Sequence, residues 1–215
     1  MSNKRIKKIA GLYIHIPFCE FKCMYCDFYS TSDKKTLIPE FVKALILEIE
    51  RCQVETQDLE IETIFIGGGT PSLLKSKYID LIINALHKKH KIDNVKEFTI
   101  EANPGEASQK RLKNFLKLGI NRLSIGVQSL SPNILRFLTR THSPNEVFKT
   151  FQNARNIGFK NINCDLLYSI PNQSWNRWSK DLKEIIKLKP DHISAYSLTS
   201  EKETQLFKLI KEKKI

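Results

Sequence analysis

Three cysteines lie close together near the start of this 215-residue chain, at Cys19, Cys23 and Cys26. The chain has only five cysteines, so this spacing indicates metal ligation rather than a disulfide framework. Intervals of three and two residues let one loop fold its thiolates around a single centre, as in iron–sulfur sites. Phe28 stands where a C-x-C ending would supply a fourth sulfur. One iron of a [4Fe–4S] cube would therefore stay open to a small molecule.

A structural zinc ion is the first alternative, because thiolates also bind zinc. Such a site usually needs four protein ligands, and only His15 lies near enough in the sequence to complete the set. Tyr13 and His15 alternate with Ile14 and Ile16, which predicts a strand whose imidazole points from a sheet face rather than into the cysteine loop. Thiols without a function are the second alternative. The ligand spacing favours the iron–sulfur interpretation over both.

Strand and helix patterns alternate along the whole chain and would position this loop. Strands are predicted at residues 12–16, 61–66, 98–101, 122–127, 162–167 and 192–197. Helices are predicted at residues 39–52, through 78–86, at 108–118, from 143 onward, at 175–188 and at 203–213. Ser108 and Ser143 are the expected N-caps, and Gly119 and Gly158 the expected helix ends. Six strand–helix units predict one α/β domain, residues 1–215, with parallel strands in a partly closed barrel.

The C-terminal ends of the predicted strands carry glycine or polar residues, and chemistry in barrels of parallel strands gathers at those ends. Gly67-Gly68-Gly69 follows the second strand, where the lack of side chains would let a ligand approach the backbone beside the hydroxyl of Thr70. A simple glycine turn is the alternative. Glu101 ends the third strand and Gln128 the fourth.

Asp165 lies within the apolar fifth strand, where a carboxylate is costly to bury without a partner. Two explanations stay open, a structural ion pair with Arg140 and a contact with a ligand. His142 is expected to be a surface or helix-cap histidine. Trp175 and Trp178 lie at helical spacing and are expected to pack rather than stack on a ligand.

The cysteine loop, read as Y-I-H-I-P-F-C and Y-C-D-F-Y-S, and the later G-G-G-T-P resemble the signature of the radical S-adenosylmethionine (SAM) superfamily. Within that superfamily, the sequence is similar to the family of the heme chaperone (HemW) and oxygen-independent coproporphyrinogen III oxidase, and this similarity covers nearly all of the chain. The resemblance implies a partial (βα)6 TIM-like barrel, open on one side. It also implies a [4Fe–4S] cluster on the three cysteines, with SAM at the open iron. The SAM contacts that it implies are Tyr13, the main chain near Tyr25, Gly68, Gly69, Thr70, Glu101, Gln128, Arg140 and Asp165, some of them toward a second SAM molecule.

The family resemblance also implies a function, a chaperone that binds heme and hands it to apo-hemoprotein acceptors. The enzyme alternative is oxidative decarboxylation of coproporphyrinogen III. The oxidases resemble C-x3-C-x2-C-x-C and carry a long N-terminal extension, whereas this chain has Phe28 and only 12 residues before Tyr13, so the chaperone interpretation leads. Relatives continue into a C-terminal domain, while this chain ends at Ile215. A truncated SAM-binding remnant is therefore the second alternative.

The charge balance suggests further partners, with 35 Lys and Arg against 23 Asp and Glu and a net charge of +12. These cations are scattered through helical segments without a dense basic run interleaved with aromatics, so we interpret them as solvated helix faces and expect no nucleic-acid partner. Porphyrin propionates remain candidate anionic partners. Neither the first ten residues nor any later run is apolar enough for a signal peptide or a membrane span. We therefore expect a cytoplasmic protein that meets a membrane only through an acceptor, with Cys52 and Cys164 as ordinary buried residues.

Overall fold

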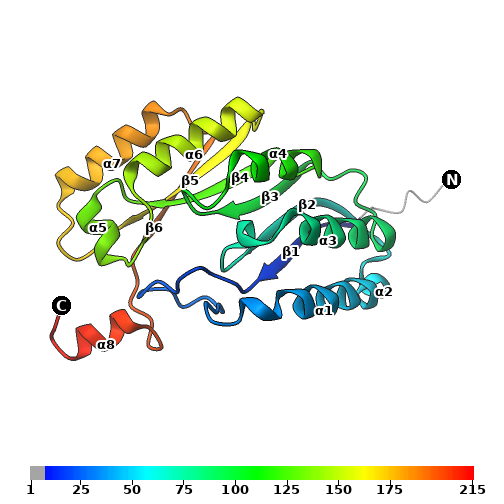
Figure 1. Ribbon diagram of the computed structural model, residues 1–215, viewed down its shortest axis with the longest axis horizontal. Helices are drawn as coiled ribbons and strands as arrows, with labels where there is room; N and C mark the ends of the chain where they lie inside the picture. Colours follow the sequence, from blue (N-terminus) through cyan, green and yellow to red (C-terminus); the bar gives the residue numbers. More distant parts are fainter. Residues whose placement is uncertain (1–7) are drawn as a thin grey trace.

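Runs rich in isoleucine, valine and leucine form six strands, which the computed structural model places side by side in one sheet (Figure 1). The structure describes residues 8–215. The strands are β1 (Lys8–Ile16), β2 (Leu59–Gly68), β3 (Glu97–Ala102), β4 (Arg122–Gln128), β5 (Asn161–Tyr168) and β6 (His192–Ser197). Their spatial order follows the sequence, and every neighbouring pair is parallel. The curved sheet is a half-barrel, which confirms the predicted partial (βα)6 TIM-like fold.

Helices connect successive strands, and one further helix follows β6. They are α1 (Ile38–Arg51), α2 (Gln53–Thr56), α3 (Ser76–Lys89), α4 (Gln109–Lys117), α5 (Pro132–Phe137), α6 (Pro144–Ile157), α7 (Trp175–Lys187) and α8 (Gln205–Lys211), with 3-10 turns at Lys35–Leu37 and Pro71–Leu73. Right-handed crossovers between sequential parallel strands place their helices on one face of the sheet. Accordingly α1 packs against α3, α3 against α4, and α4 against α6 (Figure 1).

The two faces of the sheet differ because residues along a strand point alternately to opposite sides. On the face toward the helices, Ile66, Ile100, Ile125 and Ile162 are fully buried in the main hydrophobic core. The alternate positions carry polar groups on the concave face. Register aligns them across the sheet, with Glu101 opposite Ser124, Ser124 opposite Asn163, and Asp165 opposite Ser194. A polar floor is therefore built into the strands.

Helix ends follow the local sequence as predicted. Ser143 and Glu146 form the capping box of α6, and the hydroxyl of Ser108 accepts a hydrogen bond from the backbone N–H of Arg111. Gly119 and Gly158 adopt positive φ values of 88° and 116°, which L side chains rarely adopt. These caps fix where each helix leaves the sheet.

Three helices differ from the sequence prediction. α2 and α5 were not predicted, because helices of four and six residues are too short to display an apolar period. α8 is shorter than the expected range of residues 203–213, because the side chain of Thr204 caps it by accepting from the backbone N–H of Phe207 at 3.2 Å. Of the two cysteines expected in the core, Cys164 is buried and Cys52 is half-buried. Among residues 8–215, no helix is both long and apolar enough to cross a membrane.

Candidate cofactor site at the open end of the half-barrel

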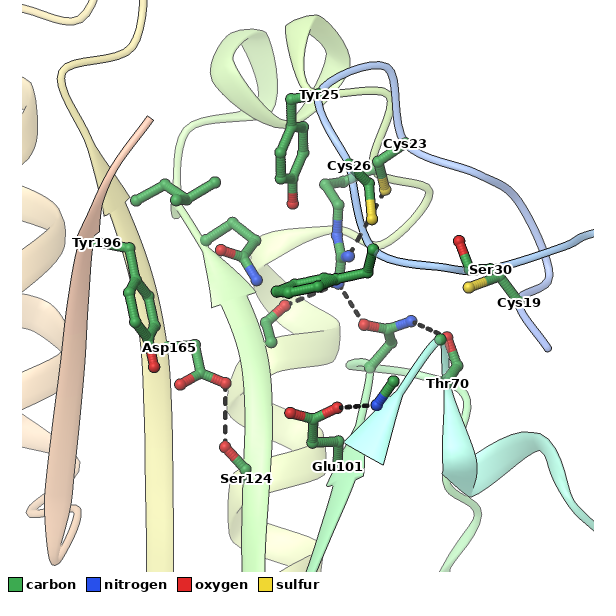
Figure 2. Close-up of a pocket in the computed structure, with 18 of the residues that line it drawn as sticks. Cys19, Cys23, Tyr25, Cys26, Ser30, Thr70, Glu101, Ser124, Asp165 and Tyr196 are labelled. Carbon is green, nitrogen blue, oxygen red and sulfur yellow. Dashed lines mark hydrogen bonds between the residues drawn. The ribbon is translucent and has the colours of Figure 1, made fainter. Parts of the chain in front are cut away.

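A cavity of about 630 Å³ lies over the concave face, at the C-terminal ends of the strands (Figure 2). It is lined by the three cysteines of the loop after β1 and by all but one of the predicted SAM contacts, namely Tyr25, Gly68, Gly69, Thr70, Glu101, Gln128, Arg140 and Asp165. Residues that are far apart in the sequence thus share one cavity. Their roles as ligands stay predictions.

Tyr13 is the exception, because it lies next to the cavity lining without being part of it. Its ring stacks on Phe65, which lines the cavity, with the ring centroids 6.0 Å apart. Its hydroxyl pairs with Nδ1 of His15 at 3.1 Å. His15 lies on the sheet face, as predicted, yet its Nε2 also pairs with the carbonyl of Tyr29 at 2.8 Å. The histidine therefore supports the end of the cysteine loop without joining the three thiols.

Backbone hydrogen bonds close the cysteine loop. The N–H of Cys19 donates to the carbonyl of Thr31 at 2.9 Å, and the N–H of Thr31 donates to the carbonyl of Pro17 at 2.7 Å. A tighter turn inside the loop joins the N–H of Cys26 to the carbonyl of Cys23 at 3.1 Å. The loop therefore has a defined shape in which all three thiols reach the cavity.

The glycine segment after β2 packs directly against this loop. Gly69 donates its N–H to the carbonyl of Ile16, and Thr70 donates to that of Phe18, both at 2.8 Å. A Cβ at Gly69 would lie 2.8 Å from the Phe18 oxygen and 2.9 Å from the Cys19 sulfur. Close packing of two loops thus requires glycine at this position. Close packing therefore accounts for Gly69 before any ligand is considered.

The thiols lie in a partly desolvated environment. Burial raises the pKa of Cys19, and a hydrogen bond from Thr70 opposes that rise. Burial likewise raises the pKa of Cys26. The buried hydroxyl of Ser30 lines the same cavity beside Cys19, and its interaction with that thiol also lowers the pKa of Cys19. Within residues 8–215, no three His, Cys, Asp or Glu side chains converge on a point suited to a single metal ion.

Arg140 links the cysteine loop to two other strands. Its Nη1 lies 3.7 Å from Sγ of Cys23, while its Nη2 donates to the carbonyl of Gly126 at 2.9 Å and to the side chain of Asn103. Asn103 in turn donates to the hydroxyl of Thr70 at 3.1 Å (Figure 2). Sequence reasoning missed Asn103, although its place directly after β3 was the available signal. These contacts hold three strand ends together.

The ion pair considered between Asp165 and Arg140 does not form. Asp165 instead accepts hydrogen bonds from the hydroxyl of Ser124 at 3.0 Å and from Nδ2 of Asn163 at 2.7 Å. Burial raises the pKa of Asp165, and these hydrogen bonds oppose the rise. The carboxylate is therefore stabilised by the polar floor and faces the cavity without a cation bound to it.

Glu101 has fewer hydrogen-bond donors than Asp165. Its carboxylate accepts one bond, from the backbone N–H of Gly68 at 3.1 Å. Burial and, secondarily, the charge of Asp165 raise the pKa of Glu101 to about 7. This carboxylate retains unused acceptor capacity toward the cavity.

The predictions for the side chains of His142 and Trp175 were wrong. His142 is buried, with Nε2 3.1 Å from the carbonyl of Val127, and burial together with the charge of Arg140 lowers its pKa to about 4. The segment after α5 turns inward there, which the sequence pattern did not reveal. Trp178 packs as expected, against the core and 5.6 Å from Tyr168. Trp175, the first residue of α7, is 76% exposed and borders a second hollow of about 420 Å³.

Comparison with known proteins identifies the family. The model of the radical SAM superfamily matches residues 13–185, most of the chain. The chain belongs to the radical SAM superfamily. This family implies a [4Fe–4S] cluster and SAM as cofactors of this radical SAM chain.

Two individual relatives and one solved structure are similar to most of this chain. The heme chaperone HemW of Buchnera aphidicola is 43% identical over 199 residues, covering 92% of this chain and 52% of the relative. HemW of Escherichia coli is 39% identical over 196 residues, with 90% and 52% covered. The solved structure of Escherichia coli coproporphyrinogen III oxidase, HemN, matches with a TM-score of 0.82 at 28% identity, covering 90% of this chain and 44% of that one. The radical SAM chain thus spans about half the length of the curated relatives it matches.

Burial of Glu101 predicts that the free energy of unfolding falls as pH rises. Because the pKa of about 7 in the fold exceeds the ordinary value of 4.5, the native state binds the extra proton between these values. This stability is fully present below the ordinary pKa and is lost as pH rises through 7. Glu101→Gln keeps an oxygen for Gly68 but carries no charge. It should raise the free energy of unfolding by roughly 3 kcal/mol near pH 8.5, and by little near pH 4.5.

Urea denaturation of the metal-free protein at both pH values measures this difference. Glu48→Gln, at an exposed position of α1, is the control and should change stability little at either pH. An effect of Glu101→Gln that does not vary with pH would contradict the raised pKa.

Proposed function

We propose that this chain is the cluster- and SAM-binding core of a heme chaperone-like radical SAM protein, which delivers heme to acceptor proteins. The observation that carries the proposal is the gathering of Cys19, Cys23 and Cys26 with Glu101 and the glycine segment around one cavity. The relatives named as heme chaperones support the carrier role.

The residues of the cysteine loop fit a [4Fe–4S] cluster. Three thiols from one closed loop line the cavity, and the guanidinium of Arg140 beside Cys23 offsets part of their negative charge when they ionise. The hydroxyl of Ser30 lies beside Cys19 and offers a further donor there. When bound, a cluster with three Cys ligands leaves one iron for the amino and carboxylate groups of SAM and can supply an electron to it.

The polar floor fits the remainder of SAM. A volume of about 630 Å³ lies within the usual range of small-molecule pockets. Glu101 can accept hydrogen bonds from ribose hydroxyls, and its binding to Gly68 holds the carboxylate at the cavity wall. Gln128, Arg140 and Asp165 line the same cavity and would meet a second SAM or a substrate.

Oxidation of coproporphyrinogen III is the competing function, favoured by the structural likeness to HemN. Phe28 argues against it, because this side chain is 70% exposed at the position expected to carry the additional cysteine of the oxidases. A carrier needs a heme-binding surface but no radical chemistry on a propionate. We therefore rank the carrier function first.

The cluster is tested by anaerobic reconstitution. Wild-type protein should take up about four iron and four sulfide per chain and give the EPR signal of a reduced cluster, since thiolates bind these irons. Cys23→Ala should lose the cluster yet keep the circular dichroism of the folded barrel. Cys52→Ala, at a half-buried cysteine between α1 and α2, is the matched control and should retain the cluster. Stoichiometric zinc without a paramagnetic cluster would refute the assignment.

SAM binding is tested at Glu101. Glu101→Ala should weaken SAM binding to the reconstituted protein by roughly 1 to 3 kcal/mol, because it removes an acceptor for buried hydroxyl donors. Isothermal titration calorimetry near pH 8, where this carboxylate is mostly ionised, measures the loss. Glu48→Ala should bind SAM like the wild type. Equal affinity in Glu101→Ala and wild type would remove this residue from the site.

Parallel assays separate the carrier from the enzyme. With SAM and a reductant under anaerobic conditions, the reconstituted protein should not decarboxylate coproporphyrinogen III. Given heme, it should show a shifted Soret band and transfer heme to an apo-hemoprotein. Formation of protoporphyrinogen would reverse our ranking. If neither activity occurs while the cluster is intact, the chain acts as a SAM-binding core alone.

A further inference from the structure

Thr139 occupies a backbone position that normally selects glycine. The chain leaves α5 through a turn in which the N–H of Thr139 donates to the carbonyl of Arg136 at 3.1 Å, and that of Arg140 donates to the carbonyl of Leu135 at 2.8 Å. This pairing is the Schellman pattern, whose left-handed residue is usually glycine or asparagine. Thr139 has φ of 54°, an unfavourable value for a β-branched residue. Such strain persists where surrounding contacts hold it.

The contact that Thr139 gains is with the cysteine loop. Its hydroxyl donates to the carbonyl of Leu138 at 2.7 Å, so its oxygen is oriented to accept from the N–H of Met24 at 2.9 Å. The two residues lie 115 positions apart in the sequence. Glycine at position 139 would relieve the backbone but could not make this bond.

Met24 is the first of the two central residues in the turn between Cys23 and Cys26. Its side chain is buried, and its carbonyl accepts from the N–H of Leu206 at the start of α8 at 2.9 Å. Both backbone polar groups of Met24 are therefore held from outside the loop. The next residue after Thr139, Arg140, contacts Cys23 itself. Consecutive residues of the α5–α6 segment thus hold consecutive residues of the cysteine loop.

We propose that Thr139 is a positioning residue, which fixes the turn between Cys23 and Cys26 in the orientation that holds a cluster. The proposal rests on the proposed cluster site. The hydroxyl of Thr139 bonds to backbone groups rather than to a thiol, and it acts through the backbone of Met24. Its effect should appear in cluster retention and in the protection of one amide.

The test compares four variants. Thr139→Val keeps the shape of the side chain and loses the acceptor, Thr139→Ser keeps the acceptor, and Thr139→Gly removes both strain and acceptor. Thr150→Val is the matched control, because the hydroxyl of Thr150 also accepts a distant backbone N–H, that of Gly105 at 3.0 Å, but on α6 away from the cysteine loop.

Two measurements decide the proposal. In the metal-free protein, amide hydrogen exchange at Met24 should be about tenfold faster in Thr139→Val and Thr139→Gly than in wild type, and unchanged in Thr139→Ser and Thr150→Val. In the reconstituted protein, iron release to a chelator should follow the same order. Thr139→Gly should release iron faster although its stability to urea is not lowered, because the strain relief offsets the lost bond. If Thr139 contributed only to the stability of the fold, iron release and stability to urea would change together.

The outcomes distinguish this proposal from the cluster assignment. Unchanged Met24 exchange in Thr139→Val would overturn the positioning role, as would iron release from Thr150→Val that is as fast as from Thr139→Val. Failure of the wild type to take up a cluster would overturn the cluster site and, with it, the positioning role toward that cluster. Faster exchange of the Met24 amide in Thr139→Val, together with unchanged iron release, would also overturn the positioning role.

Discussion

The alternation of side chains along six parallel strands is the constraint on which this site depends. Every second residue faces the helices and must be apolar, as Ile100 and Ile125 are. The residues between them need not be apolar. β3, β4 and β5 can therefore present Glu101, Ser124 and Asp165 on the concave face. Because the C-terminal ends of parallel strands share one edge, this polar floor ends beside the cysteine loop that follows β1 (Figure 2).

The polar groups of the floor need hydrogen-bond partners when no ligand is bound, and the two carboxylates differ in how many they receive. Asp165 receives hydrogen bonds from Ser124 and Asn163, while Asn163 is paired in turn with His192. Among residues 8–215, Glu101 receives a hydrogen bond from the backbone N–H of Gly68 alone. Burial and, secondarily, the charge of Asp165 raise the pKa of Glu101, and this hydrogen bond opposes the rise only in part. The floor thus combines a carboxylate that is already stabilised with one that gains most from a ligand donating hydrogen bonds.

Arg140 and Asn103 give the cavity its rigidity. A buried guanidinium needs several acceptors, and this one draws on the β1 loop, the end of β3 and the backbone of β4. Asn103 extends the connection to Thr70 after β2. Removing one member would leave another buried polar group unpaired, at a cost larger than that of an exposed contact. The cysteine loop is therefore positioned by the barrel as well as by its own backbone turns.

The sequence by itself determined the six strands, most helices and the grouping of the thiols. These are local properties, since apolar periodicity, helix caps such as Ser143 and the spacing of Cys19, Cys23 and Cys26 act over a few residues. The position of polar residues at strand ends also predicted that Glu101 and Gln128 would lie at one edge of the sheet, because parallel strands align those ends.

The tertiary structure decided the partners within that cavity. Arg140 could have paired with Asp165 by charge alone, but the turn after α5 directs it to Cys23 and Asn103, across 117 and 37 positions of sequence. Burial of His142 likewise depends on that turn, and α5 is too short to show a periodic pattern. Such contacts arise from strand register and chain direction over long separations. Local residue patterns therefore do not predict these contacts.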